Sequence, residues 1–249
     1  MTGVADLNMP TLPVSKRGWA VFAAFGLATG GFLAGFAGMF VTSSLITALG
    51  VVEVEAIRYL AGNQIQVGFA LFAAAYLYTR DDRQGFVRVR VPSAEGVAWM
   101  VLGTPVVIYL LAGLHMITTG APGGAAASGG SQLTADLHLL PVALVGQLLF
   151  AAPAEEMVYR GIVHGRLRET FDTPGIVVIG GLAFGFLHLL IGLVTLSVSL
   201  TGAVLWFVSS AIAGFVWGLA YERTENIVVP TVLHFARWTV PFGTILPFV

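Results

Sequence analysis

The chain has 249 residues, of which 57% are hydrophobic, only 10% are charged and none is cysteine. Soluble domains carry about 25% charged residues, so this composition excludes an ordinary soluble domain. The absence of cysteine excludes disulfides and thiolate metal sites, and the net charge of −1 gives no indication of a nucleic-acid partner.

The apolar residues fall into blocks of about 20, the length that crosses a hydrocarbon core about 30 Å thick. We therefore predict an all-α fold, a polytopic transmembrane helix bundle with seven or eight membrane segments. The blocks are continuously apolar rather than alternating, which argues against a transmembrane β-barrel. In chain order, the predicted segments are 18–41, 59–79, 96–117, 139–160, 175–192, 195–220 and 227–248.

Basic residues are unevenly distributed among the connections. They concentrate in the N-terminal tail and in the connection 79–95, whereas the Gly- and Ser-rich loop 120–131 contains none. By the positive-inside rule, this pattern predicts a multi-pass protein of the cell membrane with a cytoplasmic N-terminus. We divide the chain into a cytoplasmic tail (1–17), N-terminal transmembrane helices (18–136) and a C-terminal core (137–249).

The stretch AEEMVYR at the end of the fourth segment places three charges in apolar surroundings. An ionisable group inside a membrane helix costs a few kcal/mol and is a functional hypothesis by default. Because Arg160 follows Glu156 by four residues, the two side chains share a helical face and we predict an ion pair. Glu155 is then left to face a cavity beside Tyr159, where it could act as a general base. The alternative is a helix that ends at the cytoplasmic surface with its charges in water.

Two histidines lie in later apolar segments. His188 follows Phe184 by four residues on one helical face, and His234 lies in the run IVVPTVLHFARW. A lone histidine in an apolar helix is more often a hydrogen-bonded core residue, but two of them with a glutamate pair indicate a site. Glu155, His188 and His234 form a ligand set suited to Zn²⁺ with an open position for water. The same residues could also activate water without a metal ion, and the sequence leaves both alternatives open.

The fourth segment must continue past its carboxylates for this site to form. If it ended at Glu155, His188 would lie about 20 Å deeper in the membrane. Continuation of the helix through VYRGIVHGRLRE towards Asp172 removes the conflict and requires Arg160 to be paired. The other histidines receive no catalytic role: His115 and His138 are predicted at the membrane interface, and His164 on a cytoplasmic extension.

Three motifs resemble a known family in their order and spacing. They are EEMVYRG (155–161), FGFLH (184–188) and the histidine of VPTVLHFARW (229–238). Together they resemble the CAAX protease and bacteriocin-processing (CPBP) family, in its Rce1-like group of type II CAAX prenyl endopeptidases. The resemblance covers about residues 137–240.

The resemblance implies an intramembrane endopeptidase that hydrolyses a peptide bond near a membrane anchor, with a membrane-anchored peptide or protein as substrate. Glu155 matches the catalytic glutamate, and Glu156 and Arg160 match its supporting pair. His188 matches the histidine that acts with Glu155 on the attacking water, and His234 the one that stabilises the oxyanion or binds metal. Both the zinc-dependent and the metal-free mechanism are compatible with this resemblance.

One position departs from the family pattern. The family usually has Asn or Asp four residues after the last histidine, where this chain has Trp238. An indole offers one N–H donor and cannot bind a metal, whereas the neighbouring Arg237 could supply positive charge. Tyr159, Phe184, Arg237 and Trp238 are therefore predicted supporting residues. The alternative function is a non-catalytic membrane scaffold or partner protein; a proton-coupled transporter is a third hypothesis, weakened by the absence of internal repeats.

Overall fold

The structure is a computed structural model in which every regular element of the described residues is a helix. The described residues are 15–51, 53–54, 56–57, 60, 64–82, 85–119, 139–195 and 198–239. The predicted all-α class is therefore confirmed.

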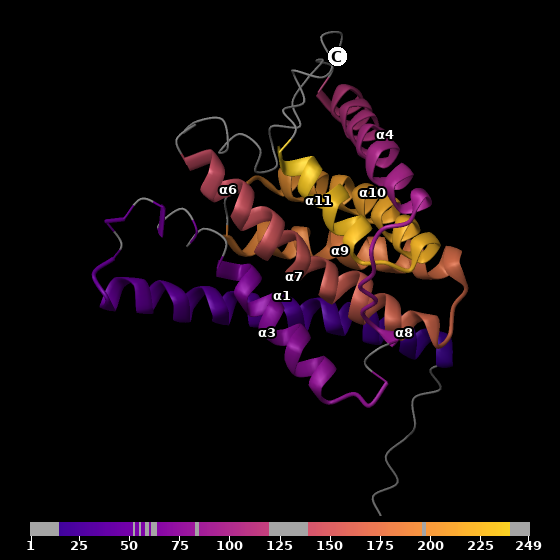
Figure 1. Cartoon of the computed structure of the whole chain (residues 1–249), viewed down its shortest axis with the longest axis horizontal. Helices are drawn as coiled ribbons and strands as arrows, with labels where there is room; N and C mark the ends of the chain where they lie inside the picture. Colours follow the sequence, from indigo (N-terminus) through magenta and orange to yellow (C-terminus); the bar gives the residue numbers. More distant parts are fainter. Residues whose placement is uncertain are drawn as a thin grey trace, which may run out of the picture.

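The helices follow one another in the order shown in Figure 1. They are α1 (Lys16–Ala48), α3 (Gln64–Tyr78), α4 (Ala94–Thr119), α9 (Thr173–Thr195), α10 (Leu200–Thr224) and α11 (Val228–Thr239), with a composite helix between α4 and α9. The composite helix joins α6 (Leu140–Gly146), η4 (Gln147–Ala151), α7 (Ala152–Glu156), η5 (Met157–Val163) and α8 (His164–Arg168).

Five of these helices are long and apolar enough to cross a membrane: α1, α4, the composite helix, α9 and α10. This supports the predicted helical membrane bundle. The second predicted segment, 59–79, contains the shorter apolar helix Ile65–Tyr78. The last one, 227–248, is described only as far as α11, and its remainder lies outside the described residues.

The composite helix continues past the carboxylates, as the sequence required. It runs without interruption to Arg168, so Glu155 lies near its middle. Two of its stretches, η4 and η5, have π-helical geometry. Pro153 is the second residue after the first of them and has no N–H to donate to the preceding turn, which favours a widened turn at this point.

The composite helix lies in the interior of the bundle over residues 151–164, whereas Val145, Leu149 and Phe150 near its start are exposed. It contacts α1 and α3 along one side and α9 and α11 along the other (Figure 1). A polar side chain within 151–164 is therefore enclosed by other helices instead of facing lipid. This arrangement lets an apolar bundle hold several ionisable groups near its centre.

Glycines allow α3 to lie unusually close to α1. A Cβ atom at Gly68 would overlap the carbonyl oxygen of Ala34, and one at Gly35 would lie 2.6 Å from a side-chain carbon of Ile65. Small residues at such contacts let helix backbones approach, which is how helices associate in membranes without a hydrophobic driving force. The close approach also brings the start of α3 over the middle of the composite helix.

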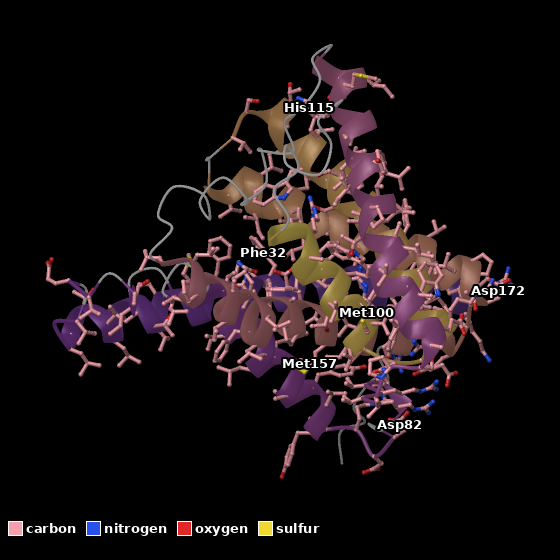
Figure 2. All side chains as sticks on the ribbon, turned by 45° about the horizontal axis from the view of Figure 1, so that its top comes forward. Phe32, Asp82, Met100, His115, Met157 and Asp172 are labelled. Atoms are coloured by element: carbon pink, nitrogen blue, oxygen red, sulfur yellow. The ribbon has the colours of Figure 1, made fainter. Side chains whose placement is uncertain are left out.

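The charged connections gather at one end of the molecule. Figure 2 shows Asp82 and Asp172 towards this end, with His115 far from both. Arg80 lies 3.8 Å from Glu169, and the guanidinium of Arg17 lies 6.0 Å from the ring of Phe171. The N-terminus of α1 and two connections thus share one end, as the predicted topology requires, while its orientation in the membrane stays a prediction.

We expect Gly68→Ala to lower the free energy of unfolding by about 1–3 kcal/mol, because the added methyl group separates α3 from α1. Denaturant unfolding in detergent micelles would measure the loss. Gly26→Ala, in α1, is the matched control, since a Cβ there meets no atom within 4 Å. Its stability should stay the same or rise by about 0.5–1 kcal/mol. Equal losses in the two variants would contradict the packing argument.

Candidate functional site

The three charged residues of AEEMVYR are all buried. Glu155, Glu156 and Arg160 are 6%, 0% and 1% exposed, respectively. The helix that carries them continues to Arg168 and is covered on both sides. The alternative of a helix ending with its charges in water is therefore wrong.

Glu156 and Arg160 form the predicted ion pair. Arg160 Nη1 donates a hydrogen bond of 3.2 Å to Glu156 Oε1. Arg160 Nε also lies 3.2 Å from Oε2, but without hydrogen-bond geometry, so the pair is not bidentate. Arg160 Nη2 donates to the carbonyl of Gly214 at 3.3 Å, and the guanidinium lies 4.8 Å from the ring of Phe184. These contacts offset part of the desolvation cost of the buried charges.

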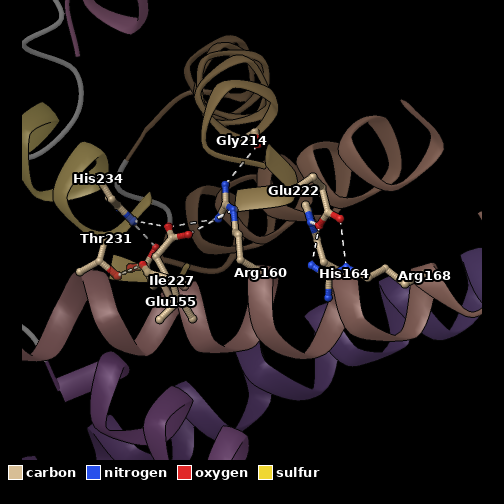
Figure 3. A network of polar contacts seen from close by, with 10 residues as sticks. Glu155, Arg160, His164, Arg168, Gly214, Glu222, Ile227, Thr231 and His234 are labelled. Carbon is tan, nitrogen blue, oxygen red and sulfur yellow. Dashed lines mark hydrogen bonds and ion pairs between the residues drawn. The ribbon is translucent and has the colours of Figure 1, made fainter. Parts of the chain in front are cut away.

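His234 of α11 is held by the same carboxylate. Its Nδ1 lies 2.9 Å from Glu156 Oε1, and because a carboxylate only accepts, Nδ1 carries the proton and donates. The ring stacks on Trp217, with centroids 4.2 Å apart and planes at 21°. These two contacts fix the tautomer and the ring plane, and they turn Nε2 towards Glu155 (Figure 3).

Glu155 presents one oxygen without a partner. Its Oε1 accepts a hydrogen bond of 3.2 Å from Gln66 Nε2. Its Oε2 is buried, has no hydrogen-bond partner within the described part of the chain, and lies 3.8 Å from His234 Nε2. That separation is too long for a direct hydrogen bond but is one that a single water molecule can bridge. A buried carboxylate oxygen left unpaired calls for an explanation, and function is one.

His188 lies on the other side of the Phe184 ring from His234. Its Nδ1 is 2.9 Å from the carbonyl oxygen of Phe184, so this nitrogen carries the proton of the neutral ring. The centroid of the Phe184 ring lies 4.6 Å from that of His188 and 5.8 Å from that of His234, and the ring separates the two imidazoles. No hydrogen bond joins His188 to Glu155 among the residues described. The structure thus brings His234, more directly than His188, to the catalytic carboxylate that the sequence predicted.

The described residues do not form a metal site. Within them, no three His, Cys, Asp or Glu side chains are placed to hold a metal ion. Zinc binding by Glu155, His188 and His234 stays a prediction, and so does the metal-free mechanism.

Three of the predicted supporting residues, Tyr159, Phe184 and Arg237, are buried in the bundle. Tyr159 and Phe184 are fully buried, with ring centroids 5.0 Å apart at a steep angle. Arg237 is also buried, and its guanidinium lies 6.0 Å from the ring of Trp217. Trp238 belongs to α11, but its side chain lies outside the described part, as do His138 and the loop 120–131.

A second buried polar group was not predicted. His164 is completely buried, with its Nδ1 2.8 Å from Glu222 Oε1 on α10. Arg168 donates two further hydrogen bonds to Glu222, of 2.6 and 3.0 Å. The sequence placed His164 on a cytoplasmic extension and gave it no role, whereas the structure shows it buried and paired with Glu222. The available signal was the spacing of four residues along the helix, Glu156, Arg160, His164 and Arg168, which predicts a shared face. The last three of them bond to residues of α10 (Figure 3).

Two other site residues were also missed. Gln66 is a polar side chain inside the apolar stretch QIQVGFALF, and the rule that flagged buried charges applies to it as well. Trp217 gave no comparable signal, because a tryptophan in an apolar helix is ordinary. Only the packing of α10 against α11 places its ring beneath His234.

Residues 137–238 match the family model described as Type II CAAX prenyl endopeptidase Rce1-like. The matched residues contain all three motifs, so the match bears out the resemblance that these motifs carry. It includes the composite helix, α9, α10 and most of α11, but not α3 with Gln66. No curated protein and no solved structure matches the chain.

We expect Arg160→Met to lower the free energy of unfolding by about 3–5 kcal/mol, because it leaves the carboxylate of Glu156 buried without its cation. The matched control is Arg166→Met, which removes a half-exposed ion pair with Glu169. Such pairs contribute about 0–1 kcal/mol. Denaturant unfolding of both variants would measure the difference, and a similar small loss in each would contradict a structural role for the buried pair.

Proposed function

We propose that the chain is an intramembrane endopeptidase that hydrolyses a peptide bond near the membrane anchor of its substrate. One observation supports this most: Glu155 Oε2 is buried, unpaired among the described residues, and faces His234 Nε2 across 3.8 Å. The match to a prenyl endopeptidase family supports the protease class in general. The five apolar helices support a membrane-embedded site and a membrane-anchored peptide or protein as substrate.

In the proposed reaction, a water molecule lies between Glu155 Oε2 and His234 Nε2. Glu155 takes one proton from this water while the water oxygen attacks the carbonyl carbon of the peptide bond. The tetrahedral intermediate then collapses, the C–N bond breaks, and the departing amine nitrogen receives the proton from Glu155. The products are a carboxylic acid and an amine, and Glu155 returns to its carboxylate form.

The remaining polar residues support this step. Glu156 orients His234 through Nδ1, in the way that a buried carboxylate orients the imidazole of a catalytic pair. Arg160 neutralises Glu156, so that two adjacent carboxylates can be held in one helical turn. Arg237 follows His234 on α11 and supplies positive charge for the developing oxyanion. The family resemblance assigns the water to His188 and the oxyanion to His234, whereas the 3.8 Å separation favours His234 as the partner of Glu155.

We expect Glu155→Gln and His234→Ala each to lower the rate of cleavage by about 10²–10⁴-fold, because each removes one of the two groups that hold the water. Cleavage of a fluorogenic peptide with a lipid anchor, in liposomes containing the purified protein, would measure the loss. Glu169→Gln, at the exposed end of the bundle, is the matched control and should cleave at the wild-type rate. Wild-type cleavage by Glu155→Gln would refute the mechanism and favour the non-catalytic scaffold.

We expect the purified protein to cleave the same peptide at an unchanged rate after exhaustive treatment with a metal chelator, because no three ligands converge among the described residues. Metal analysis of the active sample accompanies the assay. Loss of activity with the chelator and its recovery with Zn²⁺ would overturn the metal-free mechanism. The assignment as a peptidase would survive that result.

A further inference from the structure

The amide side chain of Gln66 reaches the candidate site from α3, outside the part of the chain that matches the family. Its Nε2 donates to Glu155 Oε1 at 3.2 Å. A carboxylate oxygen can only accept, so this contact also fixes which end of the amide faces Glu155. Two residues later in the same helix, Gly68 allows the close approach to Ala34 of α1 that positions this turn of α3.

This hydrogen bond makes the two oxygens of Glu155 unequal. Oε1 is occupied by Gln66, whereas Oε2 is buried, unpaired within the described ranges, and turned towards His234. The terminal torsion of a glutamate has broad, shallow preferences, so an untethered carboxylate would rotate within the site. A donor on one oxygen holds the other in a single position, and an error of about 1 Å at a reacting group is enough to slow a reaction about a hundredfold.

Gln66 also offers an acceptor. Its Oε1 is buried and has no hydrogen-bond partner among the residues that the structure describes. A bound water or the N–H of a peptide can donate to this oxygen, and either would be drawn to the same side of Glu155 as Gln66. The single amide thus has one polar atom on Glu155 and one left for a donor that enters the site.

We propose that Gln66 is a positioning residue for the hydrolysis, which fixes Glu155 through Oε1 so that Oε2 is the oxygen that takes the proton from water. The inference rests on the proposed function of Glu155 as general base. It adds that the N-terminal helices complete the site of the C-terminal core. A core consisting of residues 137–238 alone would lack this donor.

The experiment compares Gln66→Met with Gln66→Glu in the liposome cleavage assay. Methionine keeps the approximate length of the side chain but removes donor and acceptor, and we expect kcat to fall about ten- to hundredfold with KM unchanged within about twofold. Glutamate places a second carboxylate beside Glu155, and at neutral pH the repulsion between the two ionised groups drives them apart. Its activity should be lower still at neutral pH and should partly recover as the pH falls, because a protonated Glu at this position can donate as the amide does.

The pH profile separates positioning from packing. The other charged groups that face Glu155, namely Glu156, Arg160, His234 and Arg237, are the same in every variant. Ile65→Ala is the packing control, since Ile65 precedes Gln66 in α3 and packs against Gly35 of α1. We expect Ile65→Ala to lower the unfolding temperature without the acid recovery seen for Gln66→Glu.

The outcomes distinguish the two proposals. Wild-type kcat in Gln66→Met, together with an inactive Glu155→Gln, would overturn the role of Gln66 and leave the peptidase standing. Equal losses of kcat in Gln66→Met and Ile65→Ala would also overturn it. If the wild-type protein cleaves no peptide, the peptidase fails, and the carboxylate stretching band of Glu155 in infrared difference spectra tests the hydrogen bond instead. An identical band in the wild type and in Gln66→Met would then overturn the inference.

Discussion

The rest of the site depends on the two hydrogen bonds that the buried carboxylate of Glu156 accepts. Its Oε1 accepts hydrogen bonds from both Arg160 and His234, so one buried anion joins the composite helix to α11. The arginine neutralises the charge, and the imidazole is fixed in one tautomer. Without this anion, Arg160 would be an unpaired cation in the interior, and no hydrogen bond at Nδ1 would hold the Nε2 of His234 towards Glu155.

Burial away from water makes these pairings necessary and also strengthens them. Charge–charge and hydrogen-bond energies grow as the local dielectric falls, but each unpaired group becomes more costly for the same reason. Glycines permit the enclosure, because they let α3 lie against α1 and let α9 lie close to α10 at Gly181 and Gly214. Glu155 Oε2 and Glu156 Oε2 both lack a hydrogen-bond partner among the described residues. Glu156 Oε2 lies against the guanidinium of Arg160, whereas Glu155 Oε2 faces His234 Nε2 across 3.8 Å.

Much of the fold could be predicted from the sequence, since the length and hydropathy of a membrane segment are local properties. The continuation of the fourth segment followed from the need to bring Glu155 to the depth of His188, and the structure bears it out. The site was predicted less completely. Gln66 and Trp217 were missed because their roles depend on contacts with distant parts of the chain. The sequence also could not show that His234 lies closer to Glu155 than His188 does.

The sequence by itself determined the helical membrane class, the family resemblance and the Glu156–Arg160 pair, whose partners lie four residues apart on one helix. The tertiary structure decided which distant groups complete the site. His234 reaches Glu156 across 78 residues of sequence, and Gln66 reaches Glu155 across 89. Helical periodicity fixes the face on which a side chain lies but not which helix lies opposite. That choice depends on how closely glycines let particular helices approach, and it appears only when the whole bundle is packed.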